Sequence, residues 1–257
     1  MPSPHGEREQ RTTHMVTEEI DLKKTGDATR PGLLTLVLMG DSITFGQCVE
    51  PEYRWAHSVT DRLLRMYLDT PINIHVMNRG ISGETSRQGL ERFPVDVQDA
   101  HPDIMTLQFG LNDCNCWLTD RGLPRVSESA FRANLIEMIS RARLFGARHI
   151  ILSNNHRTVR HKMMLSGERY EDANARYSRI IEEVATETGV TFCDIRKAFE
   201  PFSEPELEDL LIPYPDQLHL SASGNRVYEK AIWPFIHEAV EDLIKERFRE
   251  EVYEKQY

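Results

Sequence analysis

Short apolar runs alternate with longer segments of helical periodicity along most of this chain, and this alternation is what most constrains its fold. The apolar runs have the length of buried strands and cover residues 33–39, 72–77, 104–109, 150–153 and 190–193. The other segments repeat apolar residues at helical spacing over residues 55–68, 87–100, 127–146, 170–188 and 222–250. Strands and helices in this order form a parallel sheet with helices on both faces. We therefore expect an α/β protein.

Composition narrows the possible partners. A chain of 257 residues, 40% hydrophobic and 28% charged, suits a single globular domain with a sizeable core. Its net charge of −10 argues against a nucleic-acid partner, because binding to phosphates relies on an excess of Lys and Arg. No apolar stretch approaches the roughly 20 residues that span a bilayer, so stable membrane insertion is not expected. The oligomeric state is left open.

The chain begins with a polar segment that has no apolar core of the kind found in secretory signals. We expect a disordered leader over residues 1–31 and a single domain over residues 32–257. The four cysteines are too few for a disulfide framework at this length, which favours a reducing cytoplasm. Cys114 and Cys116 form a C-x-C motif with no second Cys or His pair nearby, so we interpret them as loop thiols and predict no metal.

Four short polar strings stand in order along the chain, and the first three each follow a predicted strand. They are Gly40-Asp41-Ser42, Gly80-Ile81-Ser82-Gly83-Glu84-Thr85, Gly110-Leu111-Asn112-Asp113 and Asp216-Gln217-Leu218-His219. In open parallel sheets, ligands bind outside the carboxyl ends of the strands. One site at this edge can therefore collect residues from all four strings.

Together these strings contain the parts of an acyl-transfer catalyst. Ser42 offers a hydroxyl, which becomes a nucleophile when a base takes its proton. The spacing of Asp216 and His219 lets the carboxylate orient the imidazole. Gly83 and Asn112 offer an unobstructed backbone N–H and a side-chain amide that can stabilise an oxyanion.

Each of these residues also has a plainer interpretation. Ser42 is a good helix cap, Gly83 and Asn112 suit turns, and the last string is compatible with an ordinary polar loop. Thr44 excludes the Gly-x-Ser-x-Gly elbow of α/β-hydrolases. It is the joint order of the four strings, with three of them placed directly after strands, that favours catalysis.

The four strings resemble the blocks of the SGNH hydrolases, also called GDSL esterases and lipases, which supply Ser, Gly, Asn and His. The similarity covers about residues 34–231, and residues 78–90 are especially similar to the bacterial thioesterase I/lysophospholipase L1 branch. It implies a flavodoxin-like, three-layer α/β/α sandwich around a five-stranded parallel sheet. It further implies that Ser42 is the nucleophile, that Ser42, Gly83 and Asn112 form the oxyanion hole, and that His219 is the base with Asp216 behind it.

Two departures from this family pattern concern the loops. His219 is followed by Leu220 where the family usually has proline, which removes no catalytic group. The loop after Asn112 is longer and more unusual than in the small thioesterases, which affects substrate identity more than catalysis. We interpret Asp41 and Asp113 as structural residues that hold their loops through hydrogen bonds.

Four residues are candidates for substrate binding. His156 and Arg157 belong to a basic loop over residues 154–169, and Arg79 lies beside the predicted oxyanion turn; each is a candidate partner for an anionic group. The alternative for the loop is a solvated segment that forms ion pairs with the acidic residues 204–209. Trp117, with apolar residues 163–165, is a candidate wall for an acyl or sugar group, and ordinary packing is the alternative.

The sequence therefore predicts a serine esterase that hydrolyses carboxylic esters, or thioesters, through an acyl-enzyme and needs no cofactor. The expected partner is a small-molecule ester: a small acyl or acetyl ester, or a lysophospholipid. An acyltransferase with the same Ser/His site and a carbohydrate O-acetylesterase are alternatives. A non-catalytic binding module is another, since a fold alone does not determine function.

Overall fold

The computed structural model of the protein describes residues 33–254, with side chains up to residue 247, so the predicted leader over residues 1–31 lies outside it. Its five strands are all parallel, in the order β2-β1-β3-β4-β5. They are β1 (Leu33–Gly40), β2 (Asn73–Gly80), β3 (Ile104–Gln108), β4 (His149–Ser153) and β5 (Thr191–Cys193). This is the flavodoxin-like strand order. The predicted five-stranded parallel sheet is confirmed.

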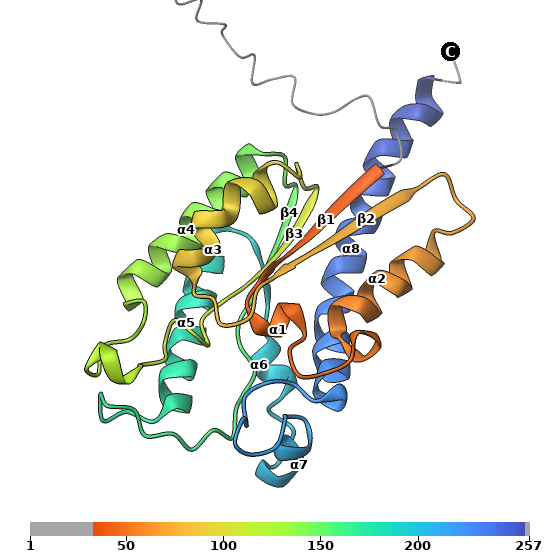
Figure 1. Ribbon diagram of the computed structural model, residues 1–257. Coiled ribbons are helices and arrows are strands. Elements are labelled where there is room, and N and C mark those ends of the chain that lie inside the picture. The colour runs from red at the N-terminus through yellow and green to blue at the C-terminus, as the bar shows by residue number, and fades with distance from the viewer. Residues whose placement is uncertain (1–32, 255–257) are drawn as a thin grey trace, which may run out of the picture.

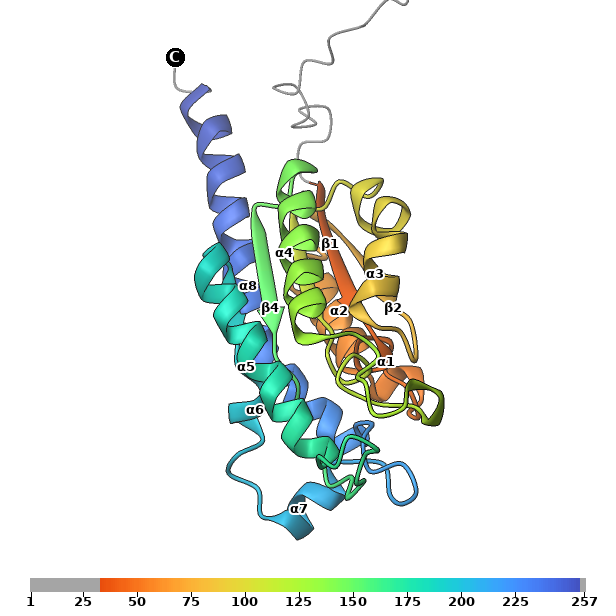
Figure 2. The same ribbon diagram turned by 90° about the vertical axis from the view of Figure 1, so that its left-hand side faces the viewer.

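Helices cover both faces of the sheet and make three layers (Figures 1 and 2). Helices α3 (Ser86–Phe93), α4 (Glu128–Leu144) and α5 (Tyr170–Thr188) pack side by side on one face. Helices α2 (Trp55–Met66) and α8 (Ala222–Glu254) pack together on the other. Because both faces are covered, the central strands are mostly apolar, and β3 is buried at every residue. Among the described residues, no helix is long and apolar enough to cross a membrane.

The structure adds short elements that the apolar pattern did not predict. They are α1 (Ser42–Phe45), α6 (Ile195–Ala198), α7 (Glu204–Asp209) and the 3₁₀ turns Pro51–Tyr53 and Leu118–Asp120. The helix predicted over residues 87–100 ends earlier as an α-helix, at Phe93, and continues as a π-helical turn over Pro94–Gln98. Proline has no N–H for the regular helical hydrogen bond, which accounts for the change at Pro94.

The strand register brings the first three polar strings to one level. Gly40 at the end of β1 pairs with Gly80 on β2 and with Gln108 on β3. The segments that follow these strands therefore leave the sheet together at its carboxyl edge, the lower edge in Figure 1. The position between β1 and β3 is where the strand order reverses, and ligands of such sheets bind there.

Candidate active site

Ser42 is the first residue of α1, directly after β1. Asp41 caps this helix, because its Oδ1 accepts a hydrogen bond of 2.9 Å from the backbone N–H of Ile43. Gly40 is required for the tight turn, since a Cβ there would lie 2.1 Å from Thr44 Oγ1 and 2.8 Å from the Gln108 carbonyl oxygen. The sequence thus turns sharply from strand to helix at Ser42, which is 3% exposed.

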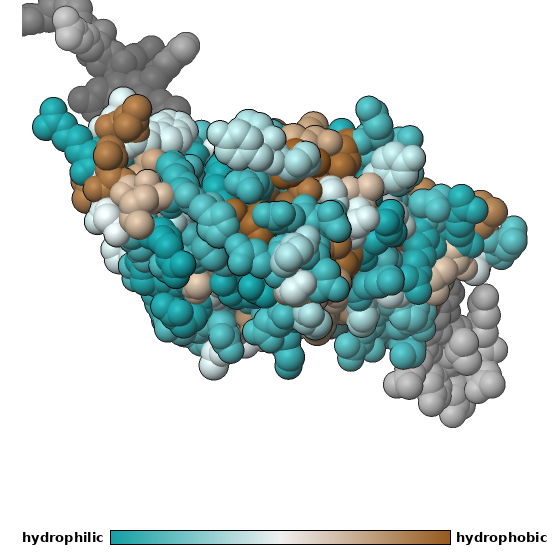
Figure 3. All heavy atoms as spheres, turned by 90° about the horizontal axis from the view of Figure 1, so that it is seen from below, coloured by the Kyte–Doolittle hydropathy of each residue, from teal (hydrophilic) through white to brown (hydrophobic). Residues whose placement is uncertain are grey.

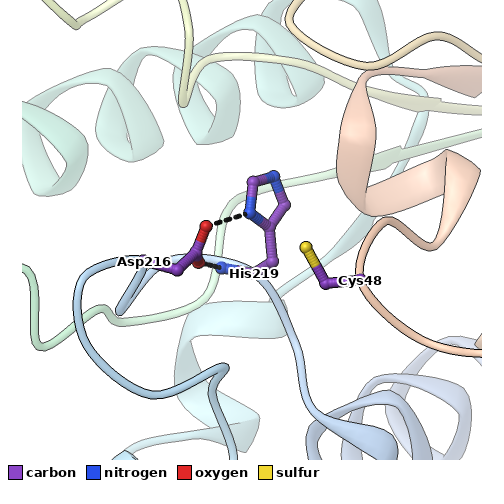
Figure 4. A group of neighbouring side chains, drawn as sticks. All are labelled: Cys48, Asp216 and His219. Atoms are coloured by element: carbon purple, nitrogen blue, oxygen red, sulfur yellow. Dashed lines mark hydrogen bonds and ion pairs between the residues drawn. The ribbon is translucent and has the colours of Figure 1, made fainter.

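A chain of hydrogen bonds links Ser42 to His219 and Asp216. His219 Nε2 lies 2.9 Å from Ser42 Oγ, and His219 Nδ1 lies 2.8 Å from Asp216 Oδ2. The second carboxylate oxygen, Oδ1, accepts from the backbone N–H groups of Leu218 at 3.0 Å and His219 at 2.7 Å. Figure 4 shows the carboxylate turned toward the imidazole. The structure therefore brings the three predicted catalytic residues together in the predicted order.

The ionisation of Asp216 suits an orienting role. Burial tends to raise the pKa of this carboxyl, but hydrogen bonds from the His219 ring and from the backbone N–H groups outweigh burial, so the pKa lies below its ordinary value. Asp216 is thus a carboxylate near neutral pH and accepts the Nδ1–H of His219. That tautomer leaves the lone pair of Nε2 directed at the Ser42 hydroxyl.

The loop that carries Asp216 and His219 is held by backbone hydrogen bonds. The backbone N–H of Ile212 donates to the His219 carbonyl at 2.7 Å, and Leu211 forms a β-bridge with Leu220. The loop is therefore closed at its base, which fixes the direction of the imidazole from outside the sheet.

The two remaining predicted oxyanion donors are placed by their neighbours. Gly83 has a φ of +80°, in the left-handed region that favours glycine, and its carbonyl accepts 2.9 Å from Arg125 Nη1. Asn112 Nδ2 donates to Asp41 Oδ2 at 3.4 Å, which connects it to the residue preceding Ser42. Asn112 thus contacts the residue next to Ser42 in sequence, at the β1–β3 boundary. Arg125 fixes the turn at Gly83 through the hydrogen bond to its carbonyl.

Asp41 and Asp113 hold the loops together, as the sequence predicted. Asp113 Oδ1 accepts from the Ser86 N–H at 2.9 Å and the Ser86 hydroxyl at 2.6 Å, which ties the third string to the start of α3. Both carboxyls are completely buried. Burial raises the pKa of Asp41 to about 7 and the pKa of Asp113 to about 6.

This burial predicts a dependence of stability on pH. Because folding raises the pKa of Asp41 from 3.8 to about 7, the folded state binds protons more readily than the unfolded state between these pH values. The contribution of Asp41 is fully present below about pH 4 and is lost as pH rises to about 7, at a rate of at most about 1.4 kcal/mol per pH unit. Asp41→Asn is neutral throughout and should flatten this fall in the free energy of unfolding, measured by urea titration.

The matched control for this experiment is the exposed carboxyl of Asp99. Asp99→Asn should leave the pH dependence of the unfolding free energy as it is in the unmodified protein. Equal slopes for Asp41→Asn and the unmodified protein would contradict the account.

The structure buries His156 out of reach of a substrate, which corrects our expectation. The His156 side chain is fully buried, and its Nε2 lies 2.8 Å from the Leu218 carbonyl oxygen. Burial lowers the pKa of His156 to about 4, so the ring is neutral at pH 7 and donates its Nε2–H to that carbonyl. Leu218 lies between Asp216 and His219, so His156 supports the loop that carries these two residues from inside the protein. The sequence could not predict this contact, because His156 and Leu218 are 62 residues apart and a histidine in a basic loop is as consistent with exposure as with burial.

The other candidate binding residues lie around the carboxyl edge. Arg157 Nη1 donates to the Phe202 carbonyl at 3.4 Å, and His161 pairs with Glu204 on α7 at 3.0 Å. This ion pair is of the kind that the alternative interpretation of the basic loop predicts. Arg79 Nε lies 3.7 Å from Asp96 Oδ1. Contacts of Arg79 or Arg157 with a substrate stay predictions.

Trp117 is connected to the predicted oxyanion turn at Gly83 through Arg125, a residue that the sequence did not single out. The Trp117 side chain is about half exposed, and the Arg125 guanidinium lies over its ring at 4.1 Å while also binding the Gly83 carbonyl. Figure 3 views this edge of the molecule, where apolar side chains come to the surface between hydrophilic ones. Trp117 therefore remains a candidate for contact with the substrate.

The two loop cysteines are bonded within their own loop. Cys114 Sγ lies 3.5 Å from the Leu111 carbonyl oxygen, and Cys116 Sγ lies 3.5 Å from that of Gly122. Both thiols are buried.

Comparisons with known proteins point to one family. The model of the GDSL-like lipase/acylhydrolase family matches residues 38–227. Esterase TesA of Pseudomonas aeruginosa is 30% identical over 46% of this chain, and the chain spans about half of its length (53%). The thioesterase 1/protease 1/lysophospholipase L1 of Escherichia coli is 30% identical over 31% of this chain and 35% of its own.

A longer match is to the acetylxylan esterase of Geobacillus stearothermophilus. It is 25% identical over 219 residues, which cover 76% of this chain and 90% of that protein. A crystal structure of that organism's acetylxylan esterase Axe2 superposes with a TM-score of 0.63 at 24% identity, over 81% of this chain and 96% of the other. The structural comparison supports the same fold.

Proposed function

Because this chain belongs to the GDSL-like lipase/acylhydrolase family, we propose that it is a serine esterase that cleaves carboxylic esters through an acyl-enzyme on Ser42. The observation that carries the proposal is the hydrogen-bonded sequence Asp216–His219–Ser42, with distances of 2.8 and 2.9 Å. These distances lie within the range needed for proton transfer between a nucleophile and its base.

In the first step, Ser42 Oγ attacks the ester carbonyl while His219 Nε2 takes the hydroxyl proton. The carbonyl π electrons move to the oxygen, which becomes an oxyanion. Asp216 stabilises the imidazolium formed on His219 but remains ionised. Collapse of the tetrahedral intermediate breaks the bond to the alcohol oxygen, and His219 returns its proton to that alcohol. The acyl group then resides on Ser42.

In the second step, water takes the place of the alcohol. His219 removes a proton from the water as its oxygen attacks the acyl carbonyl, and the same proton then passes to Ser42 Oγ as the acid leaves. The Ser42 N–H, the Gly83 N–H and the Asn112 side chain are the proposed donors to the oxyanion in both steps. The Ser42 N–H stands at a helix start directly after a strand, which holds it rigidly, as electrostatic stabilisation of an oxyanion requires.

Replacing Asn112 with alanine should lower kcat by about 100- to 1,000-fold, since this is the usual loss when one oxyanion donor is removed. KM should change little, because the lost hydrogen bond forms mainly in the transition state. Steady-state hydrolysis of p-nitrophenyl acetate measures both constants. Asn115→Ala, in the same loop, is the control and should retain activity; equal activity of the two variants would exclude Asn112 from the oxyanion hole.

The substrate is proposed to be a small acyl or acetyl ester or a lysophospholipid. The E. coli relative's name includes lysophospholipase and thioesterase activity. A second candidate is an O-acetyl ester of a carbohydrate, which the long match to the acetylxylan esterase supports. Rates for p-nitrophenyl esters from acetate to palmitate, and for acetylated xylo-oligosaccharides and lysophosphatidylcholine, separate these classes. Acyl transfer to an added alcohol that exceeds hydrolysis would instead favour an acyltransferase.

A further inference from the structure

The thiol of Cys48 lies beside the Asp216–His219 pair and has no role in the proposed reaction. One ligand atom from each of these three side chains lies within 4.8 Å of the other two. Figure 4 shows Cys48 approaching the Asp216–His219 pair from the loop after α1. Cys48 is the exposed cysteine among the four of this chain, so dissolved ions reach it from solvent.

These three side chains are a donor set suited to zinc. Thiolate, imidazole and carboxylate are its three common protein ligands, and the thiolate selects zinc over magnesium or calcium. Bonds of about 2.0–2.3 Å in a tetrahedral site hold the donor atoms roughly 3.3–3.7 Å apart. The present separations reach at most 4.8 Å, and the longer ones must close by about 1 Å, which rotation of the exposed Cys48 side chain can supply. The 2.8 Å between His219 Nδ1 and Asp216 Oδ2 must open by about 0.5 Å as the metal replaces the shared proton. Among the side chains that the structure describes, no other trio of His, Cys, Asp or Glu lies so close.

We propose that Cys48, Asp216 and His219 form an inhibitory zinc site. Zinc binds Cys48 Sγ, His219 Nδ1 and an Asp216 carboxylate oxygen, and water takes the fourth position. The Cys48 thiol loses its proton to solvent. Nδ1 must give its lone pair to the metal, so the proton of the neutral imidazole lies on Nε2.

Zinc bound in this way prevents His219 from acting as the proposed base. An Nε2 that carries a proton cannot accept another from Ser42, and Asp216 no longer orients the ring. Zinc at this site should therefore stop acyl-enzyme formation without displacing Ser42. The inhibition rests on the proposed function, whereas the binding of metal does not.

The test compares the unmodified protein with Cys48→Ala and Ser42→Ala. Zinc should inhibit p-nitrophenyl acetate hydrolysis by the unmodified protein, and EDTA should restore it, while magnesium at equal concentration should have no effect. Cys48→Ala should keep basal activity within about twofold and raise the inhibitory zinc concentration at least about 10- to 100-fold, the loss typical even for outer-shell partners of a metal. The three buried thiols remain in this variant, so inhibition through them would persist.

Cobalt(II) gives a second measurement that needs no turnover. Its thiolate charge-transfer absorption should appear with the unmodified protein and with Ser42→Ala, which keeps all three donors, and should be absent from Cys48→Ala. Equal zinc inhibition of the unmodified protein and Cys48→Ala, or no thiolate absorption in the unmodified protein, would overturn the proposal. If no ester is hydrolysed, the proposed function fails, and the cobalt absorption alone still decides the metal site.

Discussion

Ser42→Ala is expected to lower kcat for ester hydrolysis on the order of a million-fold, the loss seen when the nucleophile of a serine hydrolase is removed. Without the hydroxyl there is no atom for the acyl group to bind, and the hydrogen bond to His219 Nε2 is lost. Folding should be nearly unaffected, since only one oxygen atom is removed. The measurement is hydrolysis of p-nitrophenyl acetate at saturating substrate, with thermal unfolding of the same samples.

Ser129→Ala is the matched control, because Ser129 is exposed in the first turn of α4. It should retain the activity of the unmodified protein. If Ser42→Ala keeps activity within a few fold while remaining folded, the hydrolysis does not proceed through Ser42, and the proposed acyl-enzyme is wrong.

Asp216→Asn is expected to lower kcat about 10,000-fold with little change in structure. The asparagine Oδ1 can still accept from the Leu218 and His219 N–H groups, so the loop keeps its shape. Its NH₂ group, however, cannot accept the Nδ1–H of His219. The imidazole is then favoured in the tautomer with the proton on Nε2, which cannot take a proton from Ser42.

Asp209→Asn is the control for this substitution, because Asp209 is exposed at the end of α7. Its kcat should equal that of the unmodified protein. A loss smaller than about 10-fold in Asp216→Asn would show that Asp216 does not orient the base, although it would leave Ser42 as the nucleophile.

The sheet was predictable because its central strands are buried on both faces. Their nearly continuous apolar runs, as in β1, stand out from the surrounding sequence. The short helices α1, α6 and α7 were not predicted, because four to six residues are too few to show helical periodicity. Their positions depend instead on capping residues such as Asp41 and on the packing of the loops.

The site, like the fold, has one part that the sequence predicts and one part that it does not. Ser42, Asp216 and His219 lie in short strings whose residue types carry the chemistry, and the structure joins them by hydrogen bonds. The support from His156 and from Arg125 arises through contacts between distant segments, with the Leu218 and Gly83 carbonyls respectively. A single sequence carries no signal for such contacts, because their residue types are common in solvated loops.

The most direct test of the central claim is to locate the nucleophile covalently. A fluorophosphonate transfers its phosphonyl group to an activated serine and releases fluoride. After reaction with the unmodified protein, peptide mass spectrometry should find one adduct, on Ser42, that follows the loss of esterase activity. His219→Ala should label far more slowly, because its Ser42 hydroxyl has no base. An adduct on another residue, or unchanged labelling of His219→Ala, would contradict the Ser42–His219–Asp216 mechanism.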